Sequence, residues 1–341
     1  MSQRRPTSFD IAQLAGVSQP TVSRALRGSP GVNPTTRRRI EEIARQLNYS
    51  VDRAASNLRS GETRTIALLL FEDLGPDHAL INPFFLSMLG SIMRRCAAMG
   101  FDLLISFQDM TSDWHKQYED SHRADGLLLL GYGDYSLYRA RLEALVAQGT
   151  HFVRWGSVAA DQPGITVGSD NIGGGYQAAR HLIEQGRKRI AFLGDASDRY
   201  PEFADRHRGY VRALEESGLT VAPALQVDAV TSEEAGAEAA QAVIASGKTF
   251  DAIVAASDLI AIGAMRTLSA AGLTVPGDVA IVGFDDIPAA SLTNPPLTTV
   301  VQDARLAGQR LVDTLLKRIR EEPTESVIMP TQLVVRGSSV R

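Results

Sequence analysis

Beyond residue 63, short apolar runs of the chain alternate with longer amphipathic segments. Seven runs are short and apolar enough to be strands, at residues 65–71, 101–107, 126–130, 151–155, 189–193, 250–255 and 279–284. Segments of helical length separate most of them, including 84–99, 173–185, 203–217, 233–246 and 259–271. Repeated strand–helix alternation predicts parallel sheets covered by helices. The number of units favours two doubly wound lobes over one.

The N-terminal segment has helical spacing instead, and its first predicted helix spans residues 7–15. Thr7 is the expected cap, and Asp10 suits the positive end of the helix. The apolar positions expected to form a small core are Phe9, Ile11, Leu14 and Ala15. Gly16 then provides the positive φ that a tight turn needs.

A second helix is predicted after Ser18, because serine caps helices and Pro20 is tolerated in a first turn. Val17, Val22 and Leu26 face inward on this helix. The side chains left facing outward are Gln19, Pro20, Thr21, Ser23 and Arg24. A third helix begins at Asn33-Pro34 and runs through three arginines to Leu47.

A helix, a glycine turn and a second helix with a polar outer face form a helix-turn-helix arrangement, whose second helix reads base edges in the major groove. Heads of three helices also serve as protein-binding modules. Exposed Gln19, Thr21, Ser23 and Arg24 beside a basic third helix favour DNA. The net charge is −4 overall, but residues 1–64 carry +6 and the remainder −10. A basic head on an acidic body indicates a localised surface for a polyanion.

Composition and targeting signals predict a protein of the cytoplasm. Cys96 is the single cysteine, so an internal disulfide is excluded and a reducing compartment fits. No apolar run reaches the roughly 18 residues of a membrane span, and the N-terminus lacks the apolar core of a signal peptide. No membrane association is expected.

The head closely resembles that of the LacI/GalR family of transcription repressors. The resemblance is carried by Ala15-Gly16-Val17-Ser18, by Thr21-Val22-Ser23-Arg24 and by Leu47-Asn48-Tyr49, within the segment TSFDIAQLAGVSQPTVSRALRGSPGVNPTTRRRIEEIARQLNYSVDRAASNL. It implies that Gln19 and Pro20 are the variable base readers, that Arg24 reads guanine, and that Ser18 and Thr21 anchor phosphates. Gln19 suits an adenine edge, whereas Pro20 offers only apolar contact or shape.

Residues 52–61 join the head to the body and are too short for a helix that persists alone in water. A plain linker is one interpretation. The segment also resembles the hinge helix of the family, which forms on DNA and inserts a leucine into the minor groove. The resemblance assigns that role to Leu58, and Ala55 is small enough for close approach of the backbone.

The resemblance continues through the body and implies a two-lobed core of the periplasmic-binding-protein type I fold, with ligand bound between the lobes. It is carried by NPFF, ADGLLLL, HLIEQGRKRIAFLG, SDLIAIGAMRTL and VAIVGFDDIPAASLTNPPLTTVVQD. The expected domains are a head at 1–50, a hinge at 51–62 and a core at 63–341. We expect the first lobe to comprise about 63–161 and 293–323, and the second about 162–292 and 324–341.

The resemblance also implies an effector site, in which Asp285 binds hydroxyl groups and Arg206 faces it across the cleft. An Arg–Asp fork suits neighbouring hydroxyls of a sugar. The other residues expected at this site are Phe84, Phe85, Trp155, Ser257 and Asp258. Arg154 stands where the family usually has aspartate, and Ser257 where it often has asparagine. A sugar or glycoside is favoured, and a nucleobase sandwiched by aromatic rings is the alternative.

Other functions explain fewer features of the sequence. Asp285 and Asp286 have no His or Cys nearby in sequence to complete a metal site. Residues 131–136 approximate the GxGxxG of NAD-dependent dehydrogenases, but the third glycine is Ser136 and no acidic residue ends the next strand. A free sugar-binding protein would have a signal peptide and no basic head. We therefore predict no enzyme and no cofactor, but a homodimeric repressor on an inverted repeat, controlled by a small effector.

Overall fold

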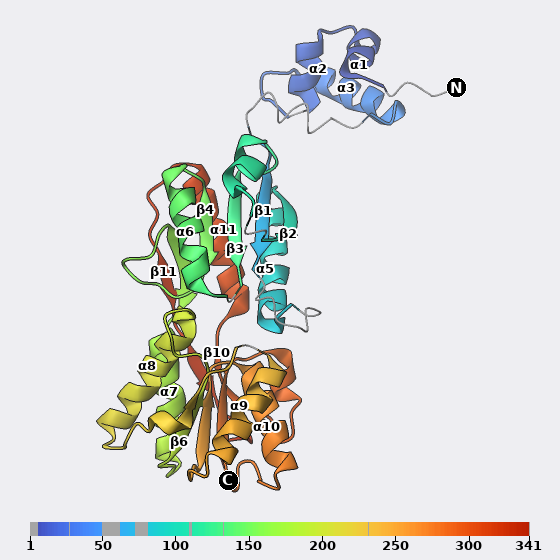
Figure 1. Ribbon diagram of the computed structural model, residues 1–341. Coiled ribbons are helices and arrows are strands. Elements are labelled where there is room, and N and C mark those ends of the chain that lie inside the picture. The colour runs from blue at the N-terminus through green and yellow to red at the C-terminus, as the bar shows by residue number, and fades with distance from the viewer. Residues whose placement is uncertain are drawn as a thin grey trace. The chain divides into compact units, whose positions relative to one another are not determined.

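The computed structural model describes residues 6–26, 28–49, 62–71, 81–108, 111–131, 133–230 and 232–340. The chain divides into two compact units, Met1–Thr63 and Arg64–Arg341. The first unit is the helical head, and the second is an α/β core built on two sheets (Figure 1).

The head consists of three helices, as the sequence predicts: α1 (Ser8–Ala15), α2 (Gln19–Leu26) and α3 (Pro34–Gln46). Asp10 accepts a hydrogen bond from the backbone N–H of Thr7 at 2.7 Å, which secures the start of α1. Gly16 ends this helix with a φ of 60°, and the side chain of Asn33 caps α3 by accepting from Thr35 N at 2.9 Å.

The core of the head is smaller than the sequence predicts. Ile11, Val22 and Ile40 are fully buried at its centre, where the three helices meet. Phe9 and Leu14, expected in this core, are 71% and 57% exposed. At about 3.6 residues per turn, a helix that turns Ile11 and Ala15 inward carries Phe9 and Leu14 to the flanks.

The first sheet of the core is entirely parallel, with strand order β11-β5-β4-β3-β1-β2. Its strands are β1 (Thr65–Leu70), β2 (Asp102–Phe107), β3 (Gly126–Leu130), β4 (Phe152–Trp155), β5 (Ile165–Ser169) and β11 (Val327–Met329). The helices of this lobe are α5 (Pro83–Met99), α6 (Tyr135–Ala147), α11 (Ala304–Ile319) and a π-helical turn at Lys116–Asp120. Every residue of β3 is buried, as expected for a central strand covered on both faces.

The second sheet has the order β12-β10-β9-β8-β6-β7, and only β12 runs antiparallel to its neighbour. Its strands are β6 (Ile190–Leu193), β7 (Gln226–Val227), β8 (Ala252–Ala255), β9 (Ala280–Asp285), β10 (Thr298–Val301) and β12 (Gln332–Val334). The helices are α7 (Asn171–Glu184), α8 (Pro201–Glu216), α9 (Glu233–Ala245) and α10 (Asp258–Ala270), with 3-10 turns at Pro223–Leu225 and Pro288–Ser291. In Figure 1, α7 and α8 lie to one side of this sheet and α9 and α10 to the other.

Helices α7 and α8 approach each other through glycines. A Cβ on Gly175 would overlap the backbone carbonyl of Arg206, and a Cβ on Gly209 would overlap that of Ile172. The two contacts are reciprocal, since each helix places a glycine against the backbone of the other. This packing fixes the position of Arg206.

The chain crosses between the lobes three times, as expected, but each crossing lies later than the sequence predicts. The crossings follow Ser169, separate β10 from α11 at Gln302 and Asp303, and separate β11 from β12 at Pro330 and Thr331. The expected crossings near 161, 293 and 323 are therefore wrong. Their positions were missed because β5, β10, β11 and β12 are short strands, several with polar residues that hide them from a search for apolar runs.

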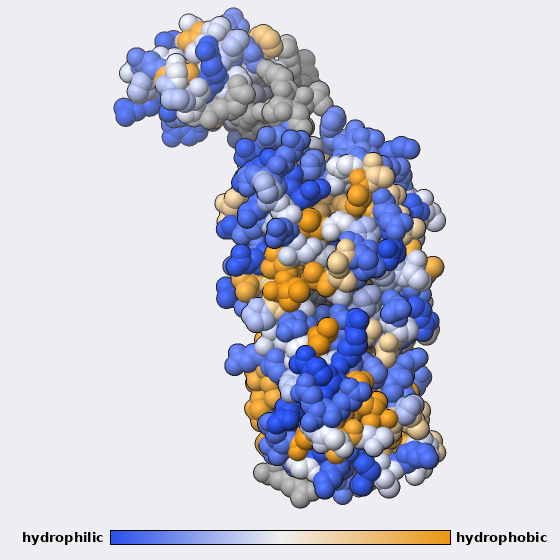
Figure 2. Space-filling model, turned by 90° about the vertical axis from the view of Figure 1, so that its left-hand side faces the viewer, coloured by the Kyte–Doolittle hydropathy of each residue, from blue (hydrophilic) through white to orange (hydrophobic). Residues whose placement is uncertain are grey.

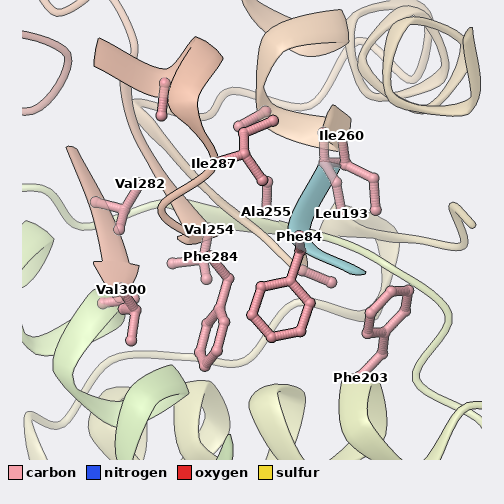
Figure 3. Packing of buried hydrophobic residues seen from close by; sticks show 14 of the residues in the cluster. Phe84, Leu193, Phe203, Val254, Ala255, Ile260, Val282, Phe284, Ile287 and Val300 are labelled. Atoms are coloured by element: carbon pink, nitrogen blue, oxygen red, sulfur yellow. The ribbon is translucent and has the colours of Figure 1, made fainter. Parts of the chain in front are cut away.

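One hydrophobic cluster includes buried residues of both lobes. Phe84, at the start of α5 in the first lobe, belongs to the same cluster as Phe203 and Phe284 of the second (Figure 3). Among the helices that the structure describes, none has both the length and the apolar character to cross a membrane.

Candidate functional site

A cleft of about 680 Å³ opens in the core, lined by both lobes. Phe84 and Ser87 of α5 lie on one side, and Asp285 to Ile287, at the carboxyl end of β9, on the other. The crossing segments around Gln302 and Pro330 complete its wall. A ligand site at the carboxyl ends of parallel strands is what a doubly wound fold predicts.

Arg206 and Asp285 form a buried ion pair, of which Asp285 lines the cleft and Arg206 lies behind it. The guanidinium Nη1 of Arg206 lies 3.7 Å from the carboxylate Oδ1 of Asp285. Arg206 also donates to Asn171 Oδ1 at 2.9 Å and to the carbonyl of Ala256, and its guanidinium carbon lies 3.8 Å from the centre of the Phe284 ring. The expectation that Arg206 faces Asp285 across the cleft is wrong, because α8 and β9 both belong to the second lobe.

The carboxyl group of Asp285 borders the cleft while being almost excluded from water. Burial raises its pKa to about 6, although Arg206 and a hydrogen bond from Gln302 act in the opposite direction. Gln302 Nε2 donates to Asp285 Oδ1 at 2.6 Å. At neutral pH the carboxylate is ionised and can accept a further hydrogen bond from a ligand hydroxyl.

Asp285 and Asp286 differ in their partners. Both have a positive φ, of 113° and 55°, so the chain turns sharply after β9 and directs the two side chains differently. Asp286 pairs with Arg336 at 2.6 Å. Asp285 pairs with Arg206, and both aspartates line the cleft.

Ser257 and Asp258 are fully buried behind the cleft. Ser257 caps α10 by accepting from Ile260 N at 3.3 Å. Asp258 accepts from the hydroxyl of Thr299 at 2.6 Å and from the N–H of Ile287 at 2.9 Å. Burial, followed by the nearby charge of Asp285, raises the pKa of Asp258 well above its usual range. These residues hold α10 against the turn after β9, and neither lines the cleft.

Three aromatic side chains expected at the site lie together. Phe84 lines the cleft, with its ring centre 5.4 Å from that of Phe85 and 5.7 Å from that of Trp155. Phe85 packs into the core instead. Trp155 does not line the cleft but borders a second, narrower space, which Phe84 does not line.

Gln302 and Asn171 bind the Arg206–Asp285 pair and were missed by sequence reasoning. Gln302 directly follows β10, a strand that its two threonines conceal. Asn171 lies two residues after the unrecognised strand β5, at the start of α7. A search for polar residues directly after every possible strand could have found both.

Arg154, which departs from the family pattern, connects buried polar groups of the first lobe. It donates to the carbonyl of Ser157 at 3.0 Å and to the side chain of Gln162. Ser157 in turn bonds to the second lobe: its N–H donates to Glu202 Oε1 at 2.8 Å and its hydroxyl to Asp205 at 2.5 Å. The start of α8 is therefore tied to the first lobe.

The expected DNA-reading side chains form one surface of the head. Ser18, Pro20 and Arg24 are exposed, and Gln19, Thr21 and Ser23 are partly so. The hydroxyls of Ser18 and Thr21 lie 2.9 Å apart, while Gln19 donates to the hydroxyl of Ser8 at 3.1 Å. The face of the head shown in Figure 2 is largely hydrophilic. Ala55 and Leu58 lie outside the described residues.

The segment that approximates a dinucleotide-binding loop is a strand-to-helix turn between β3 and α6. The carboxylate of Asp134 accepts from Ser136 N at 2.9 Å and so occupies the helix N-terminus with negative charge. A phosphate would be repelled there. Within the part of the chain that the structure describes, no three His, Cys, Asp or Glu side chains are grouped to hold a metal ion.

Comparison with known proteins shows similarity along nearly the whole chain. Residues 9–52 match the family described as bacterial regulatory proteins, lacI family, and residues 179–339 match the periplasmic binding protein-like domain. The chain is 34% identical to the transcriptional regulator CelR of Thermobifida fusca, over 98% of this chain and 99% of that protein. It is 31% identical to the transcriptional repressor CytR of Escherichia coli (strain K12), over 98% of this chain and 96% of the other.

Solved structures agree with these sequence matches. The CelR–cellobiose complex superimposes with a TM-score of 0.72 at 32% identity, covering 98% of this chain and 100% of that one. These relatives are named as transcriptional regulators or repressors, which favours regulation over the dehydrogenase alternative.

Proposed function

Because the chain belongs to the LacI family of bacterial regulatory proteins, we propose that it is a transcription repressor whose operator binding is controlled by a sugar or glycoside in the interlobe cleft. The observation that carries the sugar assignment is the Arg206–Asp285 pair beside the cleft. A carboxylate accepts from sugar hydroxyls and a guanidinium donates to their oxygens, so the pair can bind neighbouring hydroxyls. The complex of CelR with cellobiose, in a protein 32% identical, supports this choice.

A nucleobase is the second candidate effector. Phe84 and Trp155 present aromatic surface near the cleft, and aromatic faces can stack on a purine as well as cover a sugar. A thermal-shift screen of the full chain against cellobiose, glucose, ribose, adenine and cytidine separates the two classes. We expect stabilisation by a sugar; stabilisation by adenine alone would reassign the cleft.

The proposed organisation is a head at 1–50, a hinge at 51–62 and a two-lobed core, in a protein of the cytoplasm. In this proposal the exposed side chains of α2 read bases, and Leu58 of the hinge enters the minor groove. Selection of bound sequences from a random DNA pool should yield an inverted repeat, because one recognition helix reads only a half-site. A single non-repeated site would contradict the dimeric arrangement.

Exposed apolar side chains of the first lobe support a homodimer. β2 is an edge strand of its sheet, and it carries Ile105 and Phe107 with their side chains about half exposed, as are Leu86 and Met93 on α5. Such apolar surface is typical of a protein–protein contact. We propose that a second copy of the chain covers it.

Met93→Glu is therefore expected to shift the protein towards monomer, because a charge would be buried without a partner. Light scattering at micromolar concentration measures the change. Leu137→Glu, on exposed α6 of the same lobe, is the control and should leave the mass unchanged. A wild-type monomer, or equal behaviour of both variants, would count against this interface.

The pKa of Asp285 predicts how sugar affinity depends on pH. With a pKa of about 6, the group is ionised above pH 7 and protonated below pH 5. A sugar hydroxyl that donates to the carboxylate loses its acceptor on protonation, so affinity should be constant from pH 7 to 8. At pH 5, one unit below this pKa, most of the Asp285 carboxyl groups are protonated, so the affinity for sugar should be about tenfold lower. Calorimetric titration with the sugar found in the screen tests this, and Asp285→Asn should give weaker binding with a flat profile.

A further inference from the structure

A hydrogen bond between two helices of the head holds the side chain of Gln19, one of the proposed base readers. Gln19 Nε2 donates to the hydroxyl oxygen of Ser8 at 3.1 Å. Ser8 is the first residue of α1 and Gln19 the first residue of α2, so the bond joins the N-terminal ends of the two helices. Both side chains are partly exposed. The bond therefore lies at the surface of the head, where a DNA edge can reach the amide.

The fold of the head keeps the hydroxyl of Ser8 in place. Thr7 donates to Asp10 Oδ2 through its N–H at 2.7 Å and through its hydroxyl at 2.8 Å, which fixes the turn that leads into Ser8. Helices α1 and α2 share one small core, in which Ile11 and Val22 are fully buried. An acceptor at a fixed position limits the rotation of the amide that is bonded to it.

The bond leaves the Gln19 amide with the groups that match adenine. One of its two N–H groups donates to Ser8, and the other N–H and the carbonyl oxygen remain for a base. In the major groove adenine has one acceptor, N7, next to one donor, N6, whereas guanine has two acceptors, N7 and O6. To donate to both acceptors of guanine, the amide has to turn its nitrogen to the base and lose the bond to Ser8.

A glutamine that is held before DNA binds also loses less conformational freedom in the complex. Glutamine is among the side chains that lose most rotamer freedom when they are fixed, and preorganisation removes part of that cost. Pro20, the neighbouring residue proposed to read bases, has no side-chain donor or acceptor. Discrimination between the two purines at this part of the operator therefore depends on how the Gln19 amide is oriented.

We propose that Ser8 is a positioning residue for base recognition, which holds the Gln19 amide so that it selects adenine over guanine at one base pair of each half-site. This assignment rests on the proposed operator-binding function. Ser8 acts through Gln19 and makes no base contact of its own. Base selectivity is then set by two helices, although α2 is the one that reads the major groove.

The test is fluorescence anisotropy of the full chain with operator DNA selected from a random pool. Gln19 reads the base pair at which Gln19→Ala abolishes the preference, and operators with adenine or guanine at this pair are compared. Ser8→Ala should reduce the preference for adenine roughly three- to tenfold, which corresponds to one hydrogen bond. The affinity for random-sequence DNA and its dependence on salt should stay as in wild type, because the phosphate contacts are retained.

A double-mutant cycle separates positioning from a direct contact of Ser8 with DNA. In the Gln19→Ala background, Ser8→Ala should have no further effect at any base pair, because a positioning residue acts only through the side chain that it positions. Gln46→Ala is the matched control, since this exposed amide of α3 bonds to Glu42 at 3.2 Å. It should leave every base preference unchanged.

The outcomes separate the role of Ser8 from operator binding as such. An unchanged preference for adenine in Ser8→Ala would overturn the positioning role. A loss that is equal for all sequences, or that persists in the Gln19→Ala background, would also overturn it, as would selection of a base other than adenine at this pair. Wild-type base preferences in Gln19→Ala would overturn it and leave operator binding standing. A wild-type protein that selects no sequence from the pool would overturn the proposed function as well.

Discussion

Replacing Asp285 with asparagine should give a protein that binds operator like wild type but responds to its sugar only at about ten- to hundredfold higher concentration. The carboxylate loses its charge, so the charge-assisted hydrogen bonds from ligand hydroxyls weaken by about 1–3 kcal/mol. That is about ten- to hundredfold in affinity. Asparagine keeps the shape of the site and an oxygen acceptor beside the Arg206 guanidinium, whereas alanine would remove both.

The measurement is fluorescence anisotropy of operator DNA, titrated with the sugar identified by thermal shift. Ligand changes operator binding only through its different affinities for the two lobe arrangements. At sugar concentrations that saturate wild type, a variant that binds the sugar this weakly therefore stays mostly in its ligand-free state. Asp286→Asn is the comparison variant, because Asp286 also lines the cleft but pairs with Arg336 instead. An unchanged midpoint for Asp285→Asn would remove this residue from the site and leave Asp286, the other aspartate that lines the cleft, as the candidate.

Gly175→Ala should strongly destabilise the core and displace Arg206. The added methyl group would overlap the backbone carbonyl of Arg206, and backbone cannot rotate away as a side chain can. Overpacking of this kind costs about 1–3 kcal/mol or more. Denaturant unfolding should show the loss in the midpoint, and any folded fraction should bind sugar weakly.

Gly90→Ala is the matched control for this effect. Gly90 lies within α5, and a Cβ there meets nothing closer than 3.9 Å. The same substitution should then raise the free energy of unfolding by about 0.5–1 kcal/mol, as alanine does in an open helix. If both variants shift stability in the same direction, the reciprocal glycine contact between α7 and α8 does not control the packing.

The sequence predicted those elements whose apolar pattern is long or uniform. The helices of the head and seven strands of the core were found within a few residues, because a buried strand or an amphipathic helix has a repeating pattern. Strands such as β5 and β10 were missed, since Thr166, Ser169, Thr298 and Thr299 are buried in the structure but polar in the sequence. Their burial depends on neighbours that only the complete sheet supplies.

The sequence predicted the main pair of the site, Arg206 and Asp285, but not the residues that surround this pair. Arg206 and Asp285 came from the family resemblance, and the structure brings them together. The structure places Arg206 and Asp285 in the same lobe, gives Asp285 a hydrogen bond from Gln302, and surrounds Arg154 with polar contacts. All three features depend on where the chain crosses between the lobes. Those crossings were misplaced, so contacts across them could not be derived.

The late crossing between β11 and β12 has a consequence for synthesis. Residues 327–334 supply one edge strand to each sheet, so neither lobe can complete its hydrogen-bonded ladder until this segment has left the ribosome. Domains generally fold as units while the chain emerges, yet here both lobes must wait for the same few residues. A frameshift or early stop just before Val327 would therefore release a chain in which β5 and β10 become sheet edges, one in each lobe, and such newly exposed edges template aggregation.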